Sequence, residues 1–344
     1  MGYHTIIVGT DGSATAAKAV RKAARFAKVV GGKLVVVCAR VPDLVYDETA
    51  EEALAAARET AQQVRVPVET MSPSGDAGAV LVEVAESSAA DLIVVGSVGM
   101  GKERRFRLGA VAERTAHHAP CDVLIVRTTG EEGPVRRRVY EGIVTGTDGS
   151  STASEAVRRA FDLGMMLETK VTVVYVPGDP LVGAIVLERA MAAKTDWIPV
   201  ETRLADEGPP AIRIAEIADA GAGELIVVGN KGVVGARRFL LSSVPVQLAH
   251  EAARDLLIAK TTDRSIDDLR PGQGGLVTVD GKKLAVYIDE KGRTYKLSPR
   301  CQHMGCTVDW NGADKSWDCP CHGSRYRFDG EVFHGPAKKS LDPA

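Results

Sequence analysis

The sequence carries almost no net charge, because 43 lysines and arginines stand against 45 aspartates and glutamates, for a formal charge of −2. This balance gives no electrostatic case for a nucleic-acid or membrane partner. Long apolar runs are also missing: the longest, such as residues 34–39, have the size of a strand and are too short to span a bilayer. The N-terminus lacks the charged region and cleavage site of a signal peptide. We therefore expect a soluble, cytoplasmic chain.

Possible metal ligands are scarce over most of the chain and gather near its C-terminus. Four of the six cysteines and two of the seven histidines lie in residues 301–326. They form two short half-sites, Cys301-x-His303 and Cys319-x-x-His322, each with one thiolate and one imidazole. Two thiolates can hold one iron of a two-iron cluster and two neutral imidazoles the other, which raises the reduction potential. A zinc site uses the same residue types, but zinc-finger spacing pairs Cys with Cys and His with His, so the zinc interpretation is the weaker one.

These two half-sites and their spacer resemble those of Rieske [2Fe–2S] domains. Two further cysteines, Cys306 and Cys321, make the loops similar to those of Rieske proteins from respiratory and photosynthetic cytochrome complexes. The resemblance implies a disulfide between these two cysteines, and it implies that Ser324 and Tyr326 donate hydrogen bonds to cluster sulfur and raise the potential. Residues 335–337 are similar to the Pro loop that covers the cluster. Members from cytochrome complexes are membrane-anchored, so we do not expect this chain to be such a subunit.

The composition before these motifs shifts from a polar, Pro- and Gly-rich connector to a β-rich tail. Apolar runs at 276–279 and 284–288 flank Asp280-Gly281, which is a hairpin signal. A further strand is expected at 294–297. We predict a small antiparallel all-β domain of about 75 residues, which is close to the lower limit for a self-sufficient core. The cluster and the disulfide would help to stabilise it.

An internal repeat occupies the rest of the chain. The segment GTDGS at 9–13 recurs at 146–150, and LIVVG at 92–96 recurs at 225–229. The offset is 137 residues for the first pair and 133 for the second, so two similar domains lie in tandem. With the β-rich tail, the predicted domains are residues 1–130, 139–261 and 266–344.

Within each repeat, short β-branched apolar runs alternate with amphipathic stretches of helical length. This pattern predicts an α/β fold in which five parallel strands are covered on both faces, flavodoxin-like or adenine-nucleotide-α-hydrolase-like. The stretch 177–197 departs most from the first repeat, and we assign no element there. In the first repeat we expect strands at 5–8, 33–38, 67–71, 91–95 and 122–126 and helices at 14–30, 49–65, 77–88 and 109–119. In the second repeat we expect strands at 142–147, 170–176, 198–203, 224–228 and 255–259.

Open α/β sheets bind ligands beyond the carboxyl ends of their strands. Asp11 and Ser13 follow the first strand of the first repeat, and Asp148 takes the place of Asp11 in the second. An acid and a hydroxyl at this position could hold a ribose or a metal. They could equally do no more than cap the following helix.

The fourth strand of the first repeat ends in a Gly-rich loop that leads into a helix. Gly96, Gly99 and Gly109 lie in this loop. Glycine lets the backbone approach a phosphate, and a helix N-terminus favours an anion. The GxxxxGK[ST] spacing of a P-loop is absent.

Both repeats resemble universal stress protein domains. Members of that family that bind ATP carry G-x-x-G, nine residues, and then G-[ST]. The first repeat has the three glycines but Ala110 in the hydroxyl position, whereas the second has Gly229, Gly232 and Ser243 but Ser242 in place of the third glycine. The resemblance implies adenine-nucleotide binding by at least one repeat, unless the glycines serve only chain turns. It also implies that the repeats pack through their last strands as an intramolecular pseudo-dimer, or that the chain forms a homo-oligomer.

The remaining cysteines and histidines suggest no second metal centre. Cys38 and Cys121 are expected to be small buried hydrophobes, and His117 and His118 to be surface or capping residues. The mononuclear iron of a Rieske oxygenase needs two histidines and a carboxylate, and the spare histidines form no such set.

Together, these features predict a soluble iron–sulfur stress protein for one-electron transfer or redox sensing rather than a catalyst. The exposed edges of His303 and His322 would be the electron port, and the tandem domains would bind ATP or a partner. The alternative is a nucleotide-regulated adaptor or scaffold in which the cluster is a sensor or a structural element. The sequence identifies no redox partner and no convincing general base for ATP hydrolysis.

Overall fold

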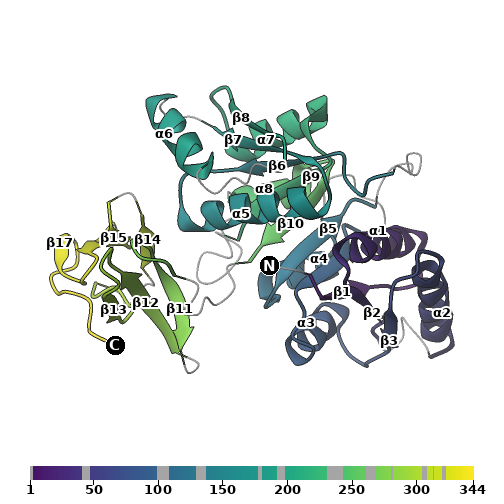
Figure 1. Ribbon diagram of the computed structural model, residues 1–344. Helices are drawn as coiled ribbons and strands as arrows, with labels where there is room; N and C mark the ends of the chain where they lie inside the picture. The colour runs from purple at the N-terminus through teal and green to yellow at the C-terminus, as the bar shows by residue number, and fades with distance from the viewer. Residues whose placement is uncertain are drawn as a thin grey trace. The chain divides into compact units, whose positions relative to one another are not determined.

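The computed structural model divides the chain into two compact units, Met1–Lys260 and Thr261–Ala344, which are described separately (Figure 1). Within the described ranges, no helix is long and apolar enough to cross a membrane. The structure describes residues 3–40, 47–98, 108–128, 137–176, 180–191, 198–230, 243–260, 266, 269–279, 282–303, 308–312, 314–319 and 323–344.

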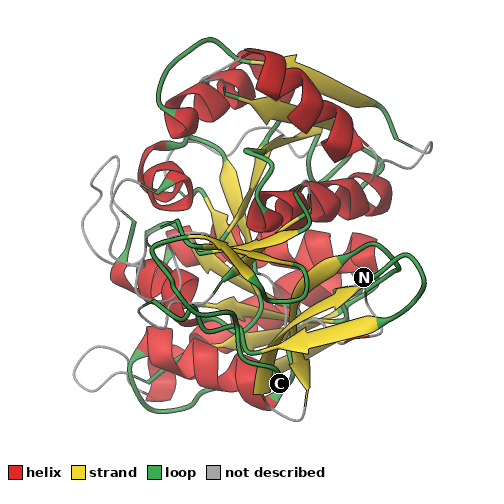
Figure 2. Ribbon diagram, turned by 90° about the vertical axis from the view of Figure 1, so that its left-hand side faces the viewer, coloured by secondary structure: helices red, strands yellow, loops and turns green. Residues whose placement is uncertain are grey.

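The first repeat alternates strands and helices as its apolar pattern predicts. Its central strands are apolar on both faces because helices cover both sides of the sheet (Figure 2). On β1, for example, Ile6 and Val8 enter one core cluster and Ile7 enters the other. The elements are β1 (Thr5–Gly9), α1 (Ala14–Val30), β2 (Lys33–Val37), α2 (Asp47–Gln63), β3 (Val68–Met71), α3 (Ala77–Ser87), β4 (Leu92–Gly96), α4 (Ala110–His118) and β5 (Asp122–Val126).

The second repeat follows the same order, and its second helix, which corresponds to α2, is one that the sequence did not reveal. That helix, α6, lies in the stretch that we left unassigned, and its Pro- and Gly-containing start hides the helical period. The elements are β6 (Gly142–Gly146), α5 (Ser151–Met166), β7 (Lys170–Tyr175), α6 (Pro180–Met191), β8 (Val200–Leu204), α7 (Pro210–Ile217), the short π-helix η1 (Ala218–Ala222), β9 (Leu225–Gly229), α8 (Val244–Glu251) and β10 (Asp255–Ala259).

The ten strands of the two repeats form one sheet in the order β3-β2-β1-β4-β5-β10-β9-β6-β7-β8. Strands within a repeat are parallel, whereas β5 and β10 pair antiparallel, with Leu124 opposite Leu257. The expected pairing through the last strands is therefore confirmed. The two halves are related by an approximate twofold axis, because the strand order of one half mirrors that of the other.

Buried polar groups hold the two halves together beside this strand pair. At the start of β5, Asp122 accepts a hydrogen bond from the Tyr3 hydroxyl at 2.7 Å and another from the Lys260 backbone N–H at 2.8 Å. The oxygen that accepts from Tyr3, Oδ2, also pairs with Arg159 Nε on α5 at 3.0 Å, and both side chains are at most 4% exposed. Arg159 and Lys260 belong to the second repeat, so the carboxylate of the first repeat is held largely by its neighbour.

The other half repeats this arrangement with the roles exchanged. Asp255 accepts from the Tyr140 hydroxyl at 2.8 Å and from the Arg127 backbone N–H at 2.8 Å, and it pairs with Lys22 of α1 at 3.3 Å. The matched residues keep the repeat offsets: Tyr3 and Tyr140, and Lys22 and Arg159, are 137 positions apart, whereas Asp122 and Asp255, and Arg127 and Lys260, are 133 positions apart. We call this group of eight residues the inter-repeat clamp: Tyr3, Lys22, Asp122, Arg127, Tyr140, Arg159, Asp255 and Lys260.

Burial governs the ionisation of the clamp. Burial raises the pKa of Asp122, against the lowering influence of Arg159, Tyr3 and the Lys260 N–H. Burial also lowers the pKa of Arg159, but Tyr3, Asp122 and Glu155 outweigh it and raise that pKa above its ordinary value. The carboxylate has lost its water, so it depends on these donors to remain charged.

Two clamp residues also reach the helices that precede the paired strands. Lys260 Nζ donates to the Ala116 carbonyl at the end of α4 at 2.6 Å, and burial lowers the pKa of Lys260 to about 8. Arg127 Nη2 donates in the same way to the Leu248 carbonyl of α8 at 2.7 Å. A cation at a helix C-terminus is favourable, and here each repeat supplies it to the other.

The second unit is an all-β domain of two small antiparallel sheets, as predicted. Its core contains Trp317 and Tyr326, both fully buried, and Gly274 lies so close to the Trp310 ring that an added Cβ would come within 2.5 Å of it. The predicted turn at Asp280-Gly281 lies outside the described residues, but the strands on either side of it pair antiparallel. The sheets are β11 (Gly274–Val279), β12 (Lys282–Ile288) and β13 (Thr294–Leu297), and β14 (Asp309–Asn311), β15 (Ser316–Asp318), β16 (Arg325–Arg327) and β17 (Val332–His334).

Candidate metal centre

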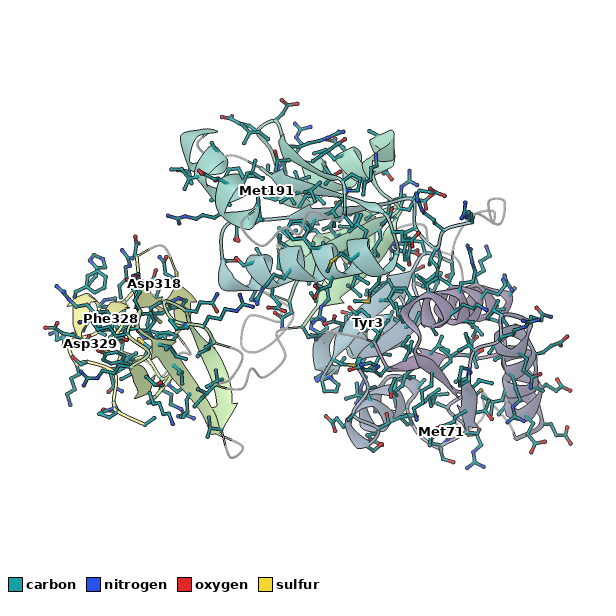
Figure 3. The ribbon with its side chains drawn as sticks, viewed as in Figure 1. Tyr3, Met71, Met191, Asp318, Phe328 and Asp329 are labelled. Carbon is teal, nitrogen blue, oxygen red and sulfur yellow. The ribbon has the colours of Figure 1, made fainter. Side chains whose placement is uncertain are left out.

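Two of the four expected ligands are buried thiols in the core of the second unit. Cys301 follows β13 and is 2% exposed, and Cys319 follows β15 directly and is 3% exposed. Both belong to the same core cluster, and the Cys319 thiol hydrogen-bonds to Cys301. The fold therefore brings together two sulfur atoms that are 18 positions apart in the sequence. Figure 3 shows the side chains of this unit around Asp318 and Phe328.

The Tyr326 hydroxyl is held against the first thiol. Tyr326 lies on β16 opposite Trp317, and its Oη is 3.0 Å from Cys301 Sγ. The same oxygen accepts the Gln302 backbone N–H at 3.0 Å. Because that N–H occupies an acceptor position of the hydroxyl, the O–H proton is free to point at sulfur. The Rieske resemblance implies a hydrogen bond from this hydroxyl to cluster sulfur, which stays a prediction.

The Ser324 hydroxyl has the same kind of support. Ser324 is fully buried, and its Oγ accepts the Ala337 backbone N–H at 3.0 Å, which leaves its proton for the neighbouring Cys301. The turn that leads to Ser324 needs glycine, because Gly323 has a φ of 74° and its N–H donates to the Cys319 carbonyl at 3.0 Å. The Pro-loop residue Ala337 thus positions a hydroxyl beside the ligand loop.

These donors favour a thiolate at Cys301. Burial raises its pKa, but hydrogen bonds from Tyr326, the His303 backbone N–H, Cys319 and Ser324 outweigh burial, and the net pKa is lowered. Burial and the neighbouring Cys301 raise the pKa of Tyr326, so its hydroxyl stays a donor. A thiolate is the form that binds a metal. The donor set therefore suits a group that places negative charge on sulfur.

The imidazole half of the predicted site is only partly described. His303 is exposed, in contrast to the two buried thiols. His322, Cys306 and Cys321 lie outside the described residues, so the fourth ligand and the disulfide stay predictions. Among the residues that the structure does describe, no group of three possible ligands comes together.

The sequence did not reveal the backbone donors of this site. The N–H groups of Gln302 and Ala337 orient the two hydroxyls, and a backbone donor leaves no residue-type signal. The similarity of residues 335–337 to a Pro loop was the one available hint.

In the tandem repeats, the residues expected to bind a nucleotide also have structural duties. Ser13 caps α1, with its Oγ accepting the Ala16 N–H at 3.1 Å, and Asp11 accepts the Ser13 N–H at 3.0 Å. In the second repeat, Asp148 accepts the Ser150 N–H at 2.9 Å in the same turn. Helix capping is therefore one role of the first loop in both repeats.

The glycines after the fourth strands differ between the repeats. A Cβ on Gly229 would meet the Thr152 carbonyl oxygen at 2.4 Å, so packing alone requires this glycine. A Cβ on Gly96 would meet Thr128 Cγ2 at 3.1 Å, which is a milder contact. Packing therefore demands glycine more strictly at Gly229 than at Gly96. Gly99, Gly232 and Ser242 lie outside the described residues.

The helix starts that follow these loops also differ. Gly109 is the N-cap of α4, offers no side-chain cap, and its N–H donates to the Ser97 carbonyl at 2.8 Å. Ser243 is the N-cap of α8, and its buried Oγ has no hydrogen-bond partner among the described residues. The second repeat therefore has a hydroxyl without a partner among the described residues at the position where Ala110 lacks one.

Comparison with known proteins identifies both units. The universal stress protein family model matches residues 2–127 and 182–260, and the Rieske [2Fe-2S] domain model matches residues 260–343. A universal stress protein from Archaeoglobus fulgidus has the same fold, with a TM-score of 0.60 and 18% identity over 77% of this chain and 98% of that chain.

The curated relatives match the second unit. YhfW of Bacillus subtilis, a provisionally assigned Rieske 2Fe-2S iron-sulfur protein, is 44% identical over 79 residues, which cover 23% of this chain and 16% of that protein. Cytochrome b6-f complex iron-sulfur subunit 1 of Nostoc sp. is 51% identical over 62 residues, or 18% of this chain and 35% of that subunit. The chain thus spans about a third or less of the length of these relatives. From the family matches, the chain belongs to the universal stress protein family and carries a Rieske [2Fe-2S] domain as its C-terminal unit.

Proposed function

We propose that this protein transfers or senses single electrons through a [2Fe–2S] cluster in its C-terminal unit. The observation that carries the proposal is the buried pair Cys301 and Cys319, with the Tyr326 hydroxyl 3.0 Å from the first sulfur. Cys301 and Cys319 would hold one iron, and His303 and His322 the other. Such a cluster, when bound, accepts or gives one electron at a raised potential.

The chain's own residues prepare this site in two ways. The core buries both thiols and excludes water from them, and the hydroxyls of Ser324 and Tyr326 point at sulfur. Because hydrogen bonds to sulfur stabilise its negative charge, they favour the reduced state and raise the potential. Exposed His303 would give a partner access to the site.

Electron paramagnetic resonance at low temperature tests this proposal. Anaerobically purified protein, reduced with dithionite, is expected to give a rhombic signal of mixed Cys/His ligation, with about two irons per chain. Metal analysis on the same sample separates iron from zinc. Stoichiometric zinc, or no metal and no signal, would contradict the proposal and leave a structural C-terminal unit.

We further propose that at least one repeat binds an adenine nucleotide such as ATP. The Ser243 hydroxyl at the start of α8, which has no partner among the described residues, supports the second repeat, and the milder packing demand on Gly96 supports the first. In each repeat the ligand would lie at the carboxyl ends of the parallel strands, near Asp11 or Asp148. The redox state of the C-terminal unit would alter nucleotide affinity if the protein is a sensor.

Calorimetry with ATP distinguishes the two repeats. Ser243→Ala is expected to weaken a site in the second repeat by about 1 kcal/mol, the value of one hydrogen bond, or roughly fivefold in Kd. Ala110→Ser should strengthen a site in the first repeat by a similar factor. Val111→Ser, one position further along α4, is the control and should leave the affinity unchanged. No heat from the wild-type protein would end the nucleotide proposal.

Several finer points stay predictions. They are the domain boundaries, the Cys306–Cys321 disulfide, the cytoplasmic location and the oligomeric state.

A further inference from the structure

Four exposed cations lie on two chain segments, one directly before the ligand residue Cys301 and one directly after Ala337. Lys296 and Arg300 precede Cys301, and Lys338 and Lys339 follow Ala337. In the part of the unit that the structure describes, none of these four side chains has an acidic partner. We call these four residues the basic rim.

Backbone hydrogen bonds place the two segments side by side. The Ser298 N–H donates to the Asp342 carbonyl at 2.7 Å, and the Ala344 N–H donates to the Lys296 carbonyl at 3.2 Å. Gln302 Nε2 also donates to Asp342 Oδ2 at 2.9 Å. The C-terminal segment therefore runs along the segment that carries the first ligand.

The other end of this segment is fixed at the second ligand loop. The Ala337 N–H donates to Ser324 Oγ at 3.0 Å, and the Cys319 N–H donates to the Ser324 carbonyl at 2.7 Å. Lys338 and Lys339 thus lie on a stretch that connects one ligand loop with the other. Exposed charge at this position is next to the expected path of the electron.

Several acidic side chains elsewhere in the unit are paired with cations, whereas Asp289 and Asp329 accept backbone N–H groups. Glu290 pairs with Lys315 at 2.8 Å, Asp318 pairs with Arg325 at 3.0 Å, and Glu331 pairs with Arg327 at 3.4 Å. On the two rim segments, Asp342 is the one acidic residue, and it already accepts from Gln302. The two rim segments beside the ligand loops therefore carry four exposed cations against one acidic side chain.

We propose that the basic rim docks an acidic electron-carrier protein, an inference that rests on the proposed electron-transfer function. One electron leaves the reduced carrier, which is oxidised, and enters the cluster, which is reduced; no bond forms or breaks. Complementary charge speeds encounter and fixes orientation, with rate gains of about 10- to 1,000-fold. The chain as a whole is nearly neutral, so the attraction would be confined to this face.

Stopped-flow reduction by a negatively charged plant-type ferredoxin tests the proposal on the full-length protein. The second-order rate is expected to fall at least about tenfold between about 0.01 M and about 0.3 M salt, because the Debye length shrinks over that range. The double variant Lys338→Glu/Lys339→Glu should lower the low-salt rate by about tenfold and remove the salt dependence. Calorimetric binding to oxidised ferredoxin gives a readout that needs no electron transfer, and it should weaken in parallel.

A matched control carries the same change of charge on the turn between β12 and β13. Lys291→Glu/Arg293→Glu should stay within about twofold of the wild-type rate. Dithionite, a small reductant, should reduce the wild type and both variants equally. If dithionite reduces none of them, the electron-transfer function itself fails.

Three other outcomes would contradict docking at the basic rim without contradicting the electron-transfer function. They are equal behaviour of the two double variants, a rate without salt dependence, or binding to anionic phosphatidylserine vesicles in place of ferredoxin. The last of these would reassign the rim to a lipid surface.

Discussion

Replacing Arg159 with methionine is expected to destabilise the tandem repeats by about 3–5 kcal/mol, the cost of removing one partner from a buried ion pair. Asp122 would keep its place at the start of β5 but lose the cation 3.0 Å away, and both side chains are almost inaccessible to water. The measurement is urea unfolding followed by the far-UV helical signal. Every α-helix in the described part of the chain lies in the first unit, so this signal reports on the repeats.

The approximate twofold symmetry supplies the control. Lys22 is the counterpart of Arg159, and Lys22→Met removes an ion pair whose lysine is 27% exposed. Because water can reach Asp255 through the partly exposed Lys22 site, this variant should lose clearly less stability than Arg159→Met. Equal losses in the two variants would show that burial does not set the strength of the clamp.

Replacing Cys301 with alanine is expected to abolish the mixed-ligand cluster, with loss of iron and of the rhombic resonance signal. Cys301 is the thiol toward which Tyr326, Ser324 and the His303 N–H converge. No other described cysteine except Cys319 shares its core cluster, so a substitute ligand is not at hand. Iron analysis and resonance spectra of the purified variant measure the effect.

Two further variants show that the loss is specific. Cys38→Ala removes a thiol that is just as buried but lies in the first repeat, and it should keep full iron content. Tyr326→Phe keeps all ligands but removes one donor to sulfur. If that bond favours the reduced state by about 1.4 kcal/mol, the potential should fall by about 60 mV for one electron. A full iron complement in the Cys301 variant would remove this residue from the ligand set.

Much of the fold could be predicted because its signals are local. Strands such as Leu92–Gly96 are continuous apolar runs, and the repeat of GTDGS fixed the number of α/β domains. Helix α6 was missed because its apolar residues occur on all sides and two of them, Val182 and Ile185, are about half exposed. Because α6 has no polar face, its apolar residues show no helical period in the sequence.

The inter-repeat clamp was missed for a different reason. Tyr3 and Tyr140, and likewise Asp122 and Asp255, obey the repeat offsets, so the sequence contained a signal. Residue type alone, however, does not distinguish a buried aspartate from an exposed one that caps a turn. Only the pairing of β5 with β10 places each carboxylate against the other repeat.

For the metal centre, spacing was enough to name candidate ligands, since cysteine and histidine are rare and their chemistry is narrow. For the nucleotide site, spacing was not enough, because glycine and serine serve several purposes. Gly229 makes room for the Thr152 carbonyl, and Ser13 caps α1. Both duties exist without any ligand.

Because a single polypeptide joins the two repeats, it also sets the number of C-terminal units per ten-stranded sheet. Two separate subunits of this kind, each fused to its own C-terminal unit, would bring two redox domains to one ten-stranded sheet. In this chain one such domain serves the whole sheet, and it follows directly on β10 of the second repeat. The repeats are therefore equivalent in fold but not in connectivity. The approximate symmetry of the repeats is therefore broken along the chain. The second repeat is adjacent in sequence to the C-terminal domain, whereas the first is separated from it by a full repeat.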